Sequence, residues 1–352
     1  MNKIAVNIIT ERYGMKEYRL CFLGFGNVGR ALARLLVAKS TELHEKHNIN
    51  WKITGVATRR LGWRSHSNGF DVNGLLAGHD ESYELQDDLE HWLRVLAPDV
   101  LFETTSLNPE SGQPAIQYLK SALEAGAHAI TANKAPIVYA YNELHQLALS
   151  KGKRFLFEST VLDSAPVFSL FRETLPVTKV RGFNGIFNST TNVILETMEA
   201  GRSFEEGVKT AQELGVAETD PTNDIEGWDS IMKVCAIANV ILKTKLRPAD
   251  VRRESIRGLT PAALQAARSE GKPYKLVARA KVNEDGSITA FVRPEQISMS
   301  DPLGSIRGTS LGVHFELDMI PGLTVISHRP NLQSTAYGLL ADFVRAVSTT
   351  SR

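Results

Sequence analysis

The sequence predicts an α/β protein in which a domain built on a parallel sheet is combined with a smaller α+β domain. From residue 18 to about 160, short apolar runs alternate with helical patterns, which is typical of βαβ units. Beyond residue 160 the connections lengthen, and segments such as 287–293 alternate in the manner of an antiparallel or mixed sheet. A chain of 352 residues has room for about two such domains.

The elements of the first domain are expected in a regular order. Buried strands are predicted for apolar runs at 19–24, 51–57, 98–105, 128–133 and 154–159. Helical patterns stand between them, most clearly at 31–38 and 115–126. Residues 1–14 show no convincing period and are interpreted as a disordered extension, which leaves Met1 and Met15 as alternative starts.

The second domain is expected to begin at residue 161. It contains an acidic segment at 218–229, a helical stretch to about residue 243, and strands at 311–317 and 323–327. An amphipathic helix predicted at 334–347 rejoins the first domain. The predicted domains are therefore 1–160 together with 331–352, and 161–330.

Charge and composition exclude several classes of protein. Lys and Arg number 40 against 39 Asp and Glu, so the formal net charge is only +1, whereas nucleic-acid binding calls for clustered basic residues. No apolar run approaches the ~18 residues of a membrane span. Cys21 and Cys235 form neither a disulfide framework nor a metal motif. We therefore expect a soluble, cytoplasmic protein without a nucleic-acid or membrane partner.

The clearest local motif is the hexapeptide G-F-G-N-V-G that starts at Gly24, directly after a predicted strand and directly before a predicted helix. In that context it is the fingerprint of a Rossmann-type dinucleotide-binding fold, although a glycine-rich turn without ligand is the alternative. Gly24 permits a tight turn, Gly26 lets the backbone approach a diphosphate, and Gly29 lets the helix pack on the strand. The diphosphate would lie on free amides at the helix N-terminus, near Asn27 and Val28.

The second predicted strand leads into Thr58-Arg59-Arg60, where an NAD-specific site would carry an acidic residue for the ribose 2′-hydroxyl. Two guanidinium groups suit a 2′-phosphate instead. NADP(H) is therefore predicted in preference to NAD(H), with solvated surface arginines as the alternative. Thr104, near the end of the third predicted strand, is assigned to the same cofactor.

Residues 211–233 contain the densest chemical signal, in which five carboxylates between 218 and 229 precede Lys233. The spacing does not fit a calcium loop, because Ile stands where that loop needs Gly. Asp229 and Lys233 are four residues apart on a predicted buried helix and therefore share one face. The pair is either a plain stabilising ion pair or a proton-transfer pair, in which Lys233 moves a hydroxyl proton and Asp229 orients it.

This segment resembles the signature of the homoserine dehydrogenase family, A-x-x-x-G-[apolar]-[small]-x-x-D-P-x-x-D-[apolar]-x-G-x-D-x-x-x-K, at every specified position. The stretch T-A-N-K at 131–134 is similar to the same motif in the family. G-I-F-N-S-T-T-N-V-I-L at 185–195 resembles its G-I-L-N-G-T-T-N-Y-I-L, and E-S-T-V at 158–161 resembles its E-A-x-V. The resemblance covers about residues 18–346, as a short form without kinase or ACT domain.

The resemblance implies reversible NAD(P)-dependent oxidoreduction between L-homoserine and L-aspartate 4-semialdehyde, a step in threonine, methionine and isoleucine biosynthesis. Lys233 with Asp229 would perform the acid/base step, and Lys134 would lie near substrate and nicotinamide. The substrate contacts carried over are Glu218 for the ammonium group, Asp224 for the reacting hydroxyl, and Thr190 with the preceding Ser189 for the amino-acid end.

The resemblance further implies a homodimer joined through the sheet of the second domain, and a site for Na⁺ or K⁺ at Glu158 and the carbonyl group of Val161. Three departures bear on ligands. Ser189 replaces the family glycine, Leu-Asp-Ser at 162–164 replaces a small-residue turn, and 328–333 replaces a glycine-rich segment.

These departures keep two further hypotheses open. The chain could be a dehydrogenase for another hydroxy amino acid or hydroxy acid, with Ser189 reshaping the pocket. It could instead be a non-catalytic NADP-binding sensor, which the joint presence of Lys134, Asp229 and Lys233 opposes. Arg329, in the third altered segment, either contacts a cofactor phosphate or faces water.

Overall fold

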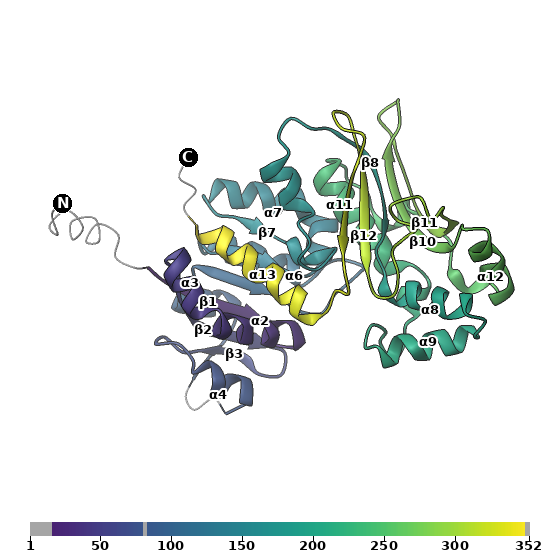
Figure 1. The fold of residues 1–352 in the computed structure, drawn as a ribbon. Helices are drawn as coiled ribbons and strands as arrows, with labels where there is room; N and C mark the ends of the chain where they lie inside the picture. The colour runs from purple at the N-terminus through teal and green to yellow at the C-terminus, as the bar shows by residue number, and fades with distance from the viewer. Residues whose placement is uncertain (1–15, 80–82, 349–352) are drawn as a thin grey trace, which may run out of the picture.

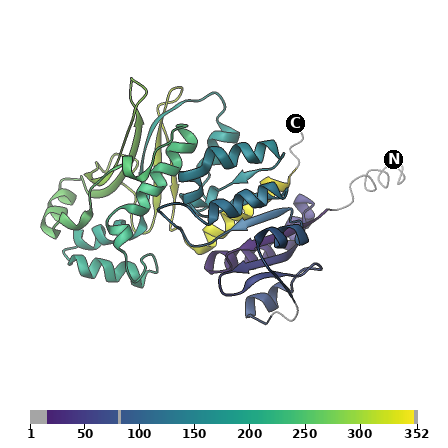
Figure 2. The same cartoon turned by 180° about the vertical axis from the view of Figure 1, so that it is seen from behind.

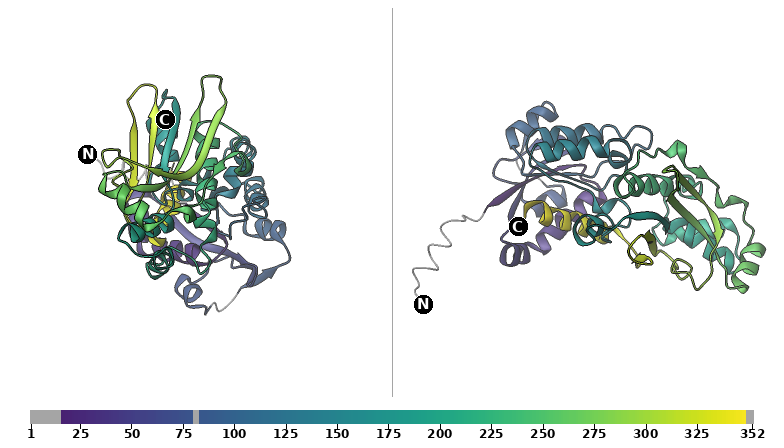
Figure 3. Two further views of the ribbon diagram at one scale, coloured as in Figure 1. Left: turned by 90° about the vertical axis from the view of Figure 1, so that its right-hand side faces the viewer. Right: turned by 90° about the horizontal axis from the view of Figure 1, so that it is seen from above.

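The computed structural model describes residues 16–79 and 83–348, and the predicted extension at 1–14 with both candidate start residues lies outside them. Within the described residues the chain forms two lobes, each with its own sheet. The two sheets lie at opposite ends of the molecule, as the front view and the view from above show (Figures 1 and 3). The predicted combination of a parallel α/β lobe and a second, sheet-containing lobe is confirmed.

The first lobe contains a seven-stranded sheet in the order β4-β3-β2-β1-β5-β6-β7. Its strands are β1 (Glu17–Leu23), β2 (Asn50–Thr58), β3 (Gly62–Ser65), β4 (Glu84–Gln86), β5 (Val100–Glu103), β6 (His128–Thr131) and β7 (Phe155–Leu156). The neighbouring strands β2, β1, β5, β6 and β7 pair in parallel. Beyond β2, the strands β3 and β4 extend the sheet with antiparallel pairing. Parallel pairing places the carboxyl ends of β1, β2, β5 and β6 along one edge.

Helices cover both faces of this sheet, as its nearly continuous apolar strands require. They are α2 (Asn27–Ala38), α3 (Ser40–His47), α4 (Val72–Ala77), α5 (Leu89–Leu96), α6 (Ala115–Glu124), α7 (Ala135–Ser150) and α13 (Leu332–Val347). The helices α2 and α13 share one core cluster with β1 and β5, and lie side by side in Figure 1. The helix α5 and Ala122 of α6 belong to another core cluster, which contains Cys21 and Leu101 on the opposite face of the sheet. Figure 2 shows the ribbon from behind, on the far side from the view of Figure 1.

The second lobe is built on a six-stranded mixed sheet in the order β13-β12-β8-β10-β11-β9. Its strands are β8 (Val180–Ile186), β9 (Arg252–Arg253), β10 (Tyr274–Val282), β11 (Ile288–Gln296), β12 (Leu311–Leu317) and β13 (Leu323–Ser327). Its helices are α8 (Ser189–Glu199), α9 (Phe204–Glu213), α10 (Thr222–Ile225), α11 (Trp228–Ile241) and α12 (Pro261–Ser269). Single turns of 3-10 or π type lie at Glu158–Thr160, Leu170–Thr174, Pro248–Asp250 and Ile256–Gly258.

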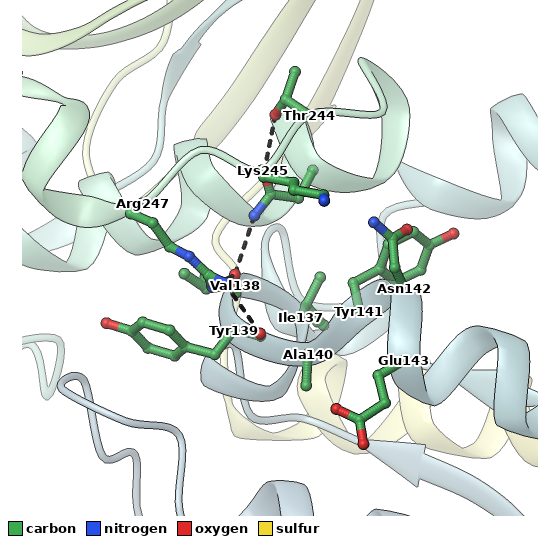
Figure 4. Close-up of a pocket in the computed structure, with 11 residues that line it drawn as sticks. Ile137, Val138, Tyr139, Ala140, Tyr141, Asn142, Glu143, Thr244, Lys245 and Arg247 are labelled. Atoms are coloured by element: carbon green, nitrogen blue, oxygen red, sulfur yellow. Dashed lines mark hydrogen bonds between the residues drawn. The ribbon is translucent and has the colours of Figure 1, made fainter.

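The lobes meet where α7 packs against α11. The backbone of α7 is interrupted at Ala140 (φ −139°, ψ 17°), so carbonyl groups near the kink need other partners. Arg247 donates to the carbonyl oxygens of Val138 and Tyr139, and Asn239 Nδ2 donates to Val138 O at 3.2 Å. Figure 4 shows Arg247 reaching these carbonyls beside a cavity of about 200 Å³. None of the predicted site residues lines that cavity.

Several elements differ from the sequence-based expectation in extent. The final helix begins at Leu332 rather than at 334, because Asn331 caps it by accepting from the amides of Gln333 and Ser334. The antiparallel extension β3–β4 and the helix α12 were not predicted. The strands expected at 311–317 and 323–327 coincide with β12 and β13. In the described residues, no helix is both long and apolar enough to cross a membrane.

Candidate active site

The glycine hexapeptide, here called the nucleotide loop, connects β1 to α2. Gly24 has φ +88°, and a Cβ at that position would lie 2.5 Å from the carbonyl oxygen of Thr104. A Cβ on Gly29 would lie 2.8 Å from Gly24 O. The Thr104 hydroxyl donates to the same Gly24 oxygen at 2.8 Å. The first and third glycines are therefore required by close backbone packing.

The middle glycine has a different environment. Gly26 is the N-cap of α2 with φ −82°, and a Cβ there would meet no atom within 4 Å. No side chain caps α2 and no acidic residue lies in its first turn, so the first amides of the helix, including those of Asn27 and Val28, have no capping side chain. An uncapped helix N-terminus of this kind accepts an anion. The loop therefore fits the diphosphate of a dinucleotide.

Arg59 and Arg60 lie in the turn between β2 and β3, and both are exposed. The turn follows the carboxyl end of β2, the strand paired with β1. It therefore lies at the same edge of the sheet as the nucleotide loop, where the ribose of a bound dinucleotide would be read. Arg329, from the altered segment at 328–333, is exposed and has φ +50°.

The central feature of the site is the lysine cluster, formed by Lys134, Asp229 and Lys233. Lys134 precedes α7 in the first lobe, and the other two residues lie on α11 in the second. Asp229 Oδ2 lies 3.0 Å from Lys233 Nζ, and Asp229 Oδ1 lies 3.2 Å from Lys134 Nζ. Their side chains are 12–20% exposed. The structure thus brings two cations from different lobes onto one carboxylate, which a simple i,i+4 helix pair would not do.

Asn188 joins this cluster to a second carboxylate and is not one of the predicted site residues. As the N-cap of α8, its Oδ1 accepts from the amide of Thr191 at 2.9 Å. Its Nδ2 donates to Asp224 Oδ1 at 2.7 Å and to Asp229 Oδ2 at 3.2 Å. Asparagine directly before a helical pattern is a typical cap, and this was the available signal. Thr190 Oγ1 lies 2.9 Å from Asp224 Oδ2.

The two carboxylates have opposite pKa shifts. Burial would raise the pKa of Asp229, but the charges of Lys233 and Lys134 and hydrogen bonds from Lys233 and Asn188 hold it well below its ordinary value. Burial and the charge of Asp229 raise the pKa of Asp224, against hydrogen bonds from Asn188 and Thr190. Asp229 is therefore the fixed anion of the site, while Asp224 takes up a proton more readily.

Asp163, part of the altered segment at 162–164, lies within electrostatic reach of both lysines. Burial raises its pKa, and the charge of Lys233 is the largest influence that opposes this rise. Its backbone is in the left-handed region (φ +53°), and its carboxylate accepts from the hydroxyls of Thr335 at 3.0 Å and Ser334 at 3.4 Å. The helix α13 thus holds a further acidic group beside the cluster.

Within the described residues, neither Ser189 nor Glu218, the other two predicted substrate residues, is hydrogen-bonded to the lysine cluster. Ser189 Oγ donates to the carbonyl oxygen of Thr309 at 2.7 Å, so the hydroxyl added at this position is already satisfied. Glu218 is exposed, and its main-chain oxygen accepts from Gln212 Nε2 at 3.2 Å. Among the residues that the structure describes, no hydrogen bond or ion pair joins the Glu218 carboxylate to the lysine cluster.

The segment predicted to hold a monovalent cation is buried. The carboxylate of Glu158 accepts from the amides of Phe168 at 2.6 Å and Ser169 at 2.9 Å, and from Arg345 at 3.4 Å. Those donors use the carboxylate oxygens, so a cation would depend on main-chain carbonyl groups such as that of Val161. Within the described part of the chain, no group of three or more His, Cys, Asp or Glu side chains is arranged for a metal ion.

Comparison with known families accounts for both lobes. The model of the homoserine dehydrogenase family matches residues 166–344, which include α8, α11 and the second sheet. The model of the homoserine dehydrogenase NAD binding domain matches residues 24–158, which include the nucleotide loop and Lys134.

Individual relatives cover nearly the whole chain. An NAD(+)-dependent homoserine dehydrogenase of Pseudomonas canavaninivorans is 35% identical over 346 residues, covering 96% of this chain and 98% of that protein. The crystal structure of a homoserine dehydrogenase from Thiobacillus denitrificans gives a TM-score of 0.81 at 27% identity, covering 95% of this chain and 74% of that one. A hyperthermophilic archaeal homoserine dehydrogenase mutant in complex with NADPH gives 0.78 at 25% identity, covering 94% and 98%.

Proposed function

Because the chain belongs to the homoserine dehydrogenase family, we propose that it catalyses the reversible oxidoreduction of L-homoserine and L-aspartate 4-semialdehyde. The observation that carries this proposal is the lysine cluster, in which Lys134 from the nucleotide-binding lobe meets Asp229 and Lys233 from the other lobe. A reaction between a dinucleotide and an alcohol needs proton-transfer groups where the two lobes meet.

The nucleotide loop and the uncapped N-terminus of α2 would hold the dinucleotide by its diphosphate. Asn27 and Val28 would supply amides, and Thr104 supports the loop through its bond to Gly24 O. When bound, the nicotinamide supplies the hydride acceptor in one direction and the hydride donor in the other. Arg59 and Arg60 favour NADP(H) over NAD(H), because guanidinium groups pair well with a 2′-phosphate. NAD(H) is the alternative, since the Pseudomonas relative is NAD(+)-dependent.

Lys233, once its ammonium group has released a proton to solvent, would take the hydroxyl proton of homoserine as the adjacent carbon is oxidised. In reverse, its ammonium form would give a proton to the oxygen of the aldehyde. The ammonium form that results is held by Asp229, whose depressed pKa keeps it ionised over the ordinary working range. Lys134, paired to the other oxygen of Asp229, would face the substrate and nicotinamide. The lysines thus share one counter-charge, so a proton gained by one is stabilised without movement of the carboxylate.

The substrate's amino-acid end would lie at the N-terminus of α8, against Thr190 and Ser189. Asp224 would position the reacting hydroxyl, since it is held by Asn188 next to Asp229. Glu218, in an exposed segment between α9 and α10, would reach the substrate ammonium as a charge-assisted acceptor.

A second function is favoured by one residue. Ser189 stands where the family has glycine, so a pocket shaped for another hydroxy amino acid or hydroxy acid is the alternative. The geometry of the lysine cluster argues against the non-catalytic sensor. Partly burying three ionised side chains costs free energy, and binding of a dinucleotide alone does not require them.

The proposal is tested by measuring NADP⁺ and NAD⁺ reduction with L-homoserine and with a panel of other hydroxy amino acids and hydroxy acids. We expect L-homoserine with NADP⁺ to give the highest kcat/KM. A higher value for another substrate would establish the second function, and absence of turnover with all of them despite NADPH binding would establish the sensor.

Assembly, ions and compartment complete the proposal. We expect a homodimer through the six-stranded sheet, to be checked by light scattering. The lobes divide at residue 160, with 331–352 returning to the first. Cys21 and Cys235 are buried free thiols, which suits a reducing cytoplasm.

The cation site proposed at Val161 is tested by measuring activity in NaCl, in KCl and in choline chloride at equal ionic strength. If the site binds Na⁺ or K⁺, activity should be higher in the salt of that cation than in choline chloride. Identical rates in all three salts would show that no such site acts in catalysis.

A further inference from the structure

Glu103 is a buried acidic residue that the proton transfer proposed above does not use. It ends β5 next to the nucleotide loop and has no exposed surface. Burial raises its pKa, while hydrogen bonds from Thr105 and Thr131 oppose that rise. No described lysine, arginine or histidine pairs with it. A buried carboxylate that lacks a cationic partner is costly and depends on its hydrogen bonds.

The hydrogen bonds of Glu103 lead toward Lys134. Its Oε1 accepts from the amide of Thr105 at 2.8 Å, and its Oε2 accepts from the hydroxyl of Thr131 at 2.6 Å. The main-chain oxygen of Glu103 accepts from the amide of Ala132 at 3.2 Å. Both the side chain and the backbone of Glu103 therefore hold the loop that follows β6.

The chain of bonds continues on both sides of Lys134. Thr131 Oγ1 accepts from the amide of Asn133 at 2.9 Å. Asn133 Oδ1 in turn accepts from the amide of Ala135, the first residue of α7, at 3.1 Å. Lys134 stands between these two bonded residues. Hydrogen bonds that begin at the buried Glu103 carboxylate therefore hold the backbone on both sides of Lys134.

We propose that Glu103 is a positioning residue, which acts through Thr131 and Asn133 to hold Lys134 against Asp229 across the junction of the lobes. Asp229 is fixed by its own helix partner Lys233 and by Asn188, whereas Lys134 approaches from the other lobe. Its 3.2 Å contact with Asp229 therefore depends on how rigidly the 131–134 loop is held. This inference rests on the proposed role of Lys134 in catalysis.

Replacement of one hydroxyl tests the inference. Thr131→Val preserves the shape of the side chain and removes its bond to Glu103, whereas Thr131→Ser keeps the hydroxyl. We expect Thr131→Val to lower kcat by about 10- to 100-fold, as expected for a displaced catalytic group, with NADPH affinity nearly unchanged. Thr131→Ser should retain kcat within about threefold, because the same bond can form.

The matched control is Thr54→Val in β2, since Thr54 is 1% exposed and, among the residues that the structure describes, its hydroxyl is hydrogen-bonded to Cys21 Sγ alone, at 3.7 Å. We expect its kcat to equal that of the parent. If Thr131→Val also keeps the parental kcat, or if Thr131→Ser is as impaired as Thr131→Val, the positioning role is wrong. Should Thr131→Val not fold, Asn133→Ser, which keeps an oxygen acceptor, is compared with Asn133→Ala. Equal kcat of those two variants would likewise overturn the inference.

A double substitution separates this inference from the function of Lys134. In a Lys134→Met background, Thr131→Val should cause no further loss of kcat, because its effect passes through the lysine. A multiplicative loss would show that Thr131 acts by another route and would overturn the inference. A Lys134→Met variant with parental kcat would instead refute the proposed role of Lys134 itself.

Discussion

The nucleotide loop and the lysine cluster lie at the same edge of the seven-stranded sheet but draw on the chain in different ways. The loop is one continuous hexapeptide whose function depends on backbone groups and on the absence of Cβ atoms at Gly24 and Gly29. The cluster assembles side chains from two lobes, and its residues lie about 100 positions apart in sequence, at Lys134 and Asp229. The loop should therefore be sensitive to added volume, and the cluster to lost charge.

The largest effect is expected at the cluster. Lys233→Ala should lower kcat by about 100- to 10,000-fold, the range typical of removing a general acid or base. Fluorescence titration should show nearly unchanged NADPH affinity, because Lys233 lies outside the nucleotide loop. Lys209→Ala, an exposed lysine on α9 that pairs with Glu213, is the control. Parental activity of the Lys233 variant would refute the proton-transfer role.

A pair of glycine variants tests the volume side of the comparison. Gly24→Ala should lower the free energy of unfolding by about 2–4 kcal/mol, from a positive φ and a Cβ crowded against Thr104 O. Gly26→Ala should change that free energy by less than about 1 kcal/mol, yet weaken NADPH binding, because its Cβ would occupy the space left for the diphosphate. Urea unfolding and NADPH titration measure the two effects. Equal destabilisation by both would contradict the distinction.

The double variant Arg59→Ala with Arg60→Ala tests whether side chains also contribute to cofactor selection at the nucleotide site. Loss of charge-assisted hydrogen bonds to a 2′-phosphate should raise the KM for NADP⁺ by about 10- to 100-fold, and leave the KM for NAD⁺ nearly unchanged. Steady-state kinetics with both cofactors provide the measurement. If both KM values change alike, the two arginines do not select the phosphate.

The fixed charge of Asp229 should appear in the pH dependence of stability. A carboxyl group with a pKa lowered by folding stabilises the protein above its unfolded pKa, about 4, and this contribution is lost as pH falls through the folded pKa. Asp229→Asn should therefore be less stable than the parent at pH 7, by about 1–3 kcal/mol, and the difference should shrink below pH ~4. Asp87→Asn, whose side chain is 91% exposed, serves as control. A pH-independent difference would contradict the assignment.

The smallest effect is expected at Ser189, the departure from the family glycine. Because its hydroxyl is bonded to Thr309 O, Ser189→Gly should lower kcat/KM for L-homoserine by about threefold to tenfold, the value of one hydrogen bond. The order of substrate preference should stay the same. A rise for L-homoserine, accompanied by a loss for another hydroxy acid, would favour the second function.

The comparison also explains what could be predicted from sequence. The nucleotide loop was found because Gly24, Gly26 and Gly29 carry their meaning within one hexapeptide and its flanking elements. Asp229 and Lys233 were paired by helical spacing alone. The third member, Lys134, came only from a resemblance, since nothing in spacing joins residue 134 to residue 229.

Other features depended on tertiary contacts. The roles of Asn188 and Asp163 follow from hydrogen bonds and charges that span 36 or more residues, such as Asn188 to Asp224. The return of the last helix to the first lobe was predicted, whereas its start at Leu332 depended on the cap by Asn331. The antiparallel extension at β3 and β4 was missed, because strands of three or four residues carry too little periodicity to be distinguished from loops.

The position of α13 has a consequence for how the protein is made. Phe343 of this helix packs edge-on against Phe102 in the first lobe, and Leu339 and Leu340 join the same core cluster as Leu20 and Phe22. A ribosome delivers the N-terminal strands of that lobe long before these residues emerge. The first lobe therefore cannot complete its core, and part of its sheet stays uncovered, until nearly the whole chain has been synthesised. Throughout that interval the nascent lobe exposes apolar surface of the kind that favours aggregation.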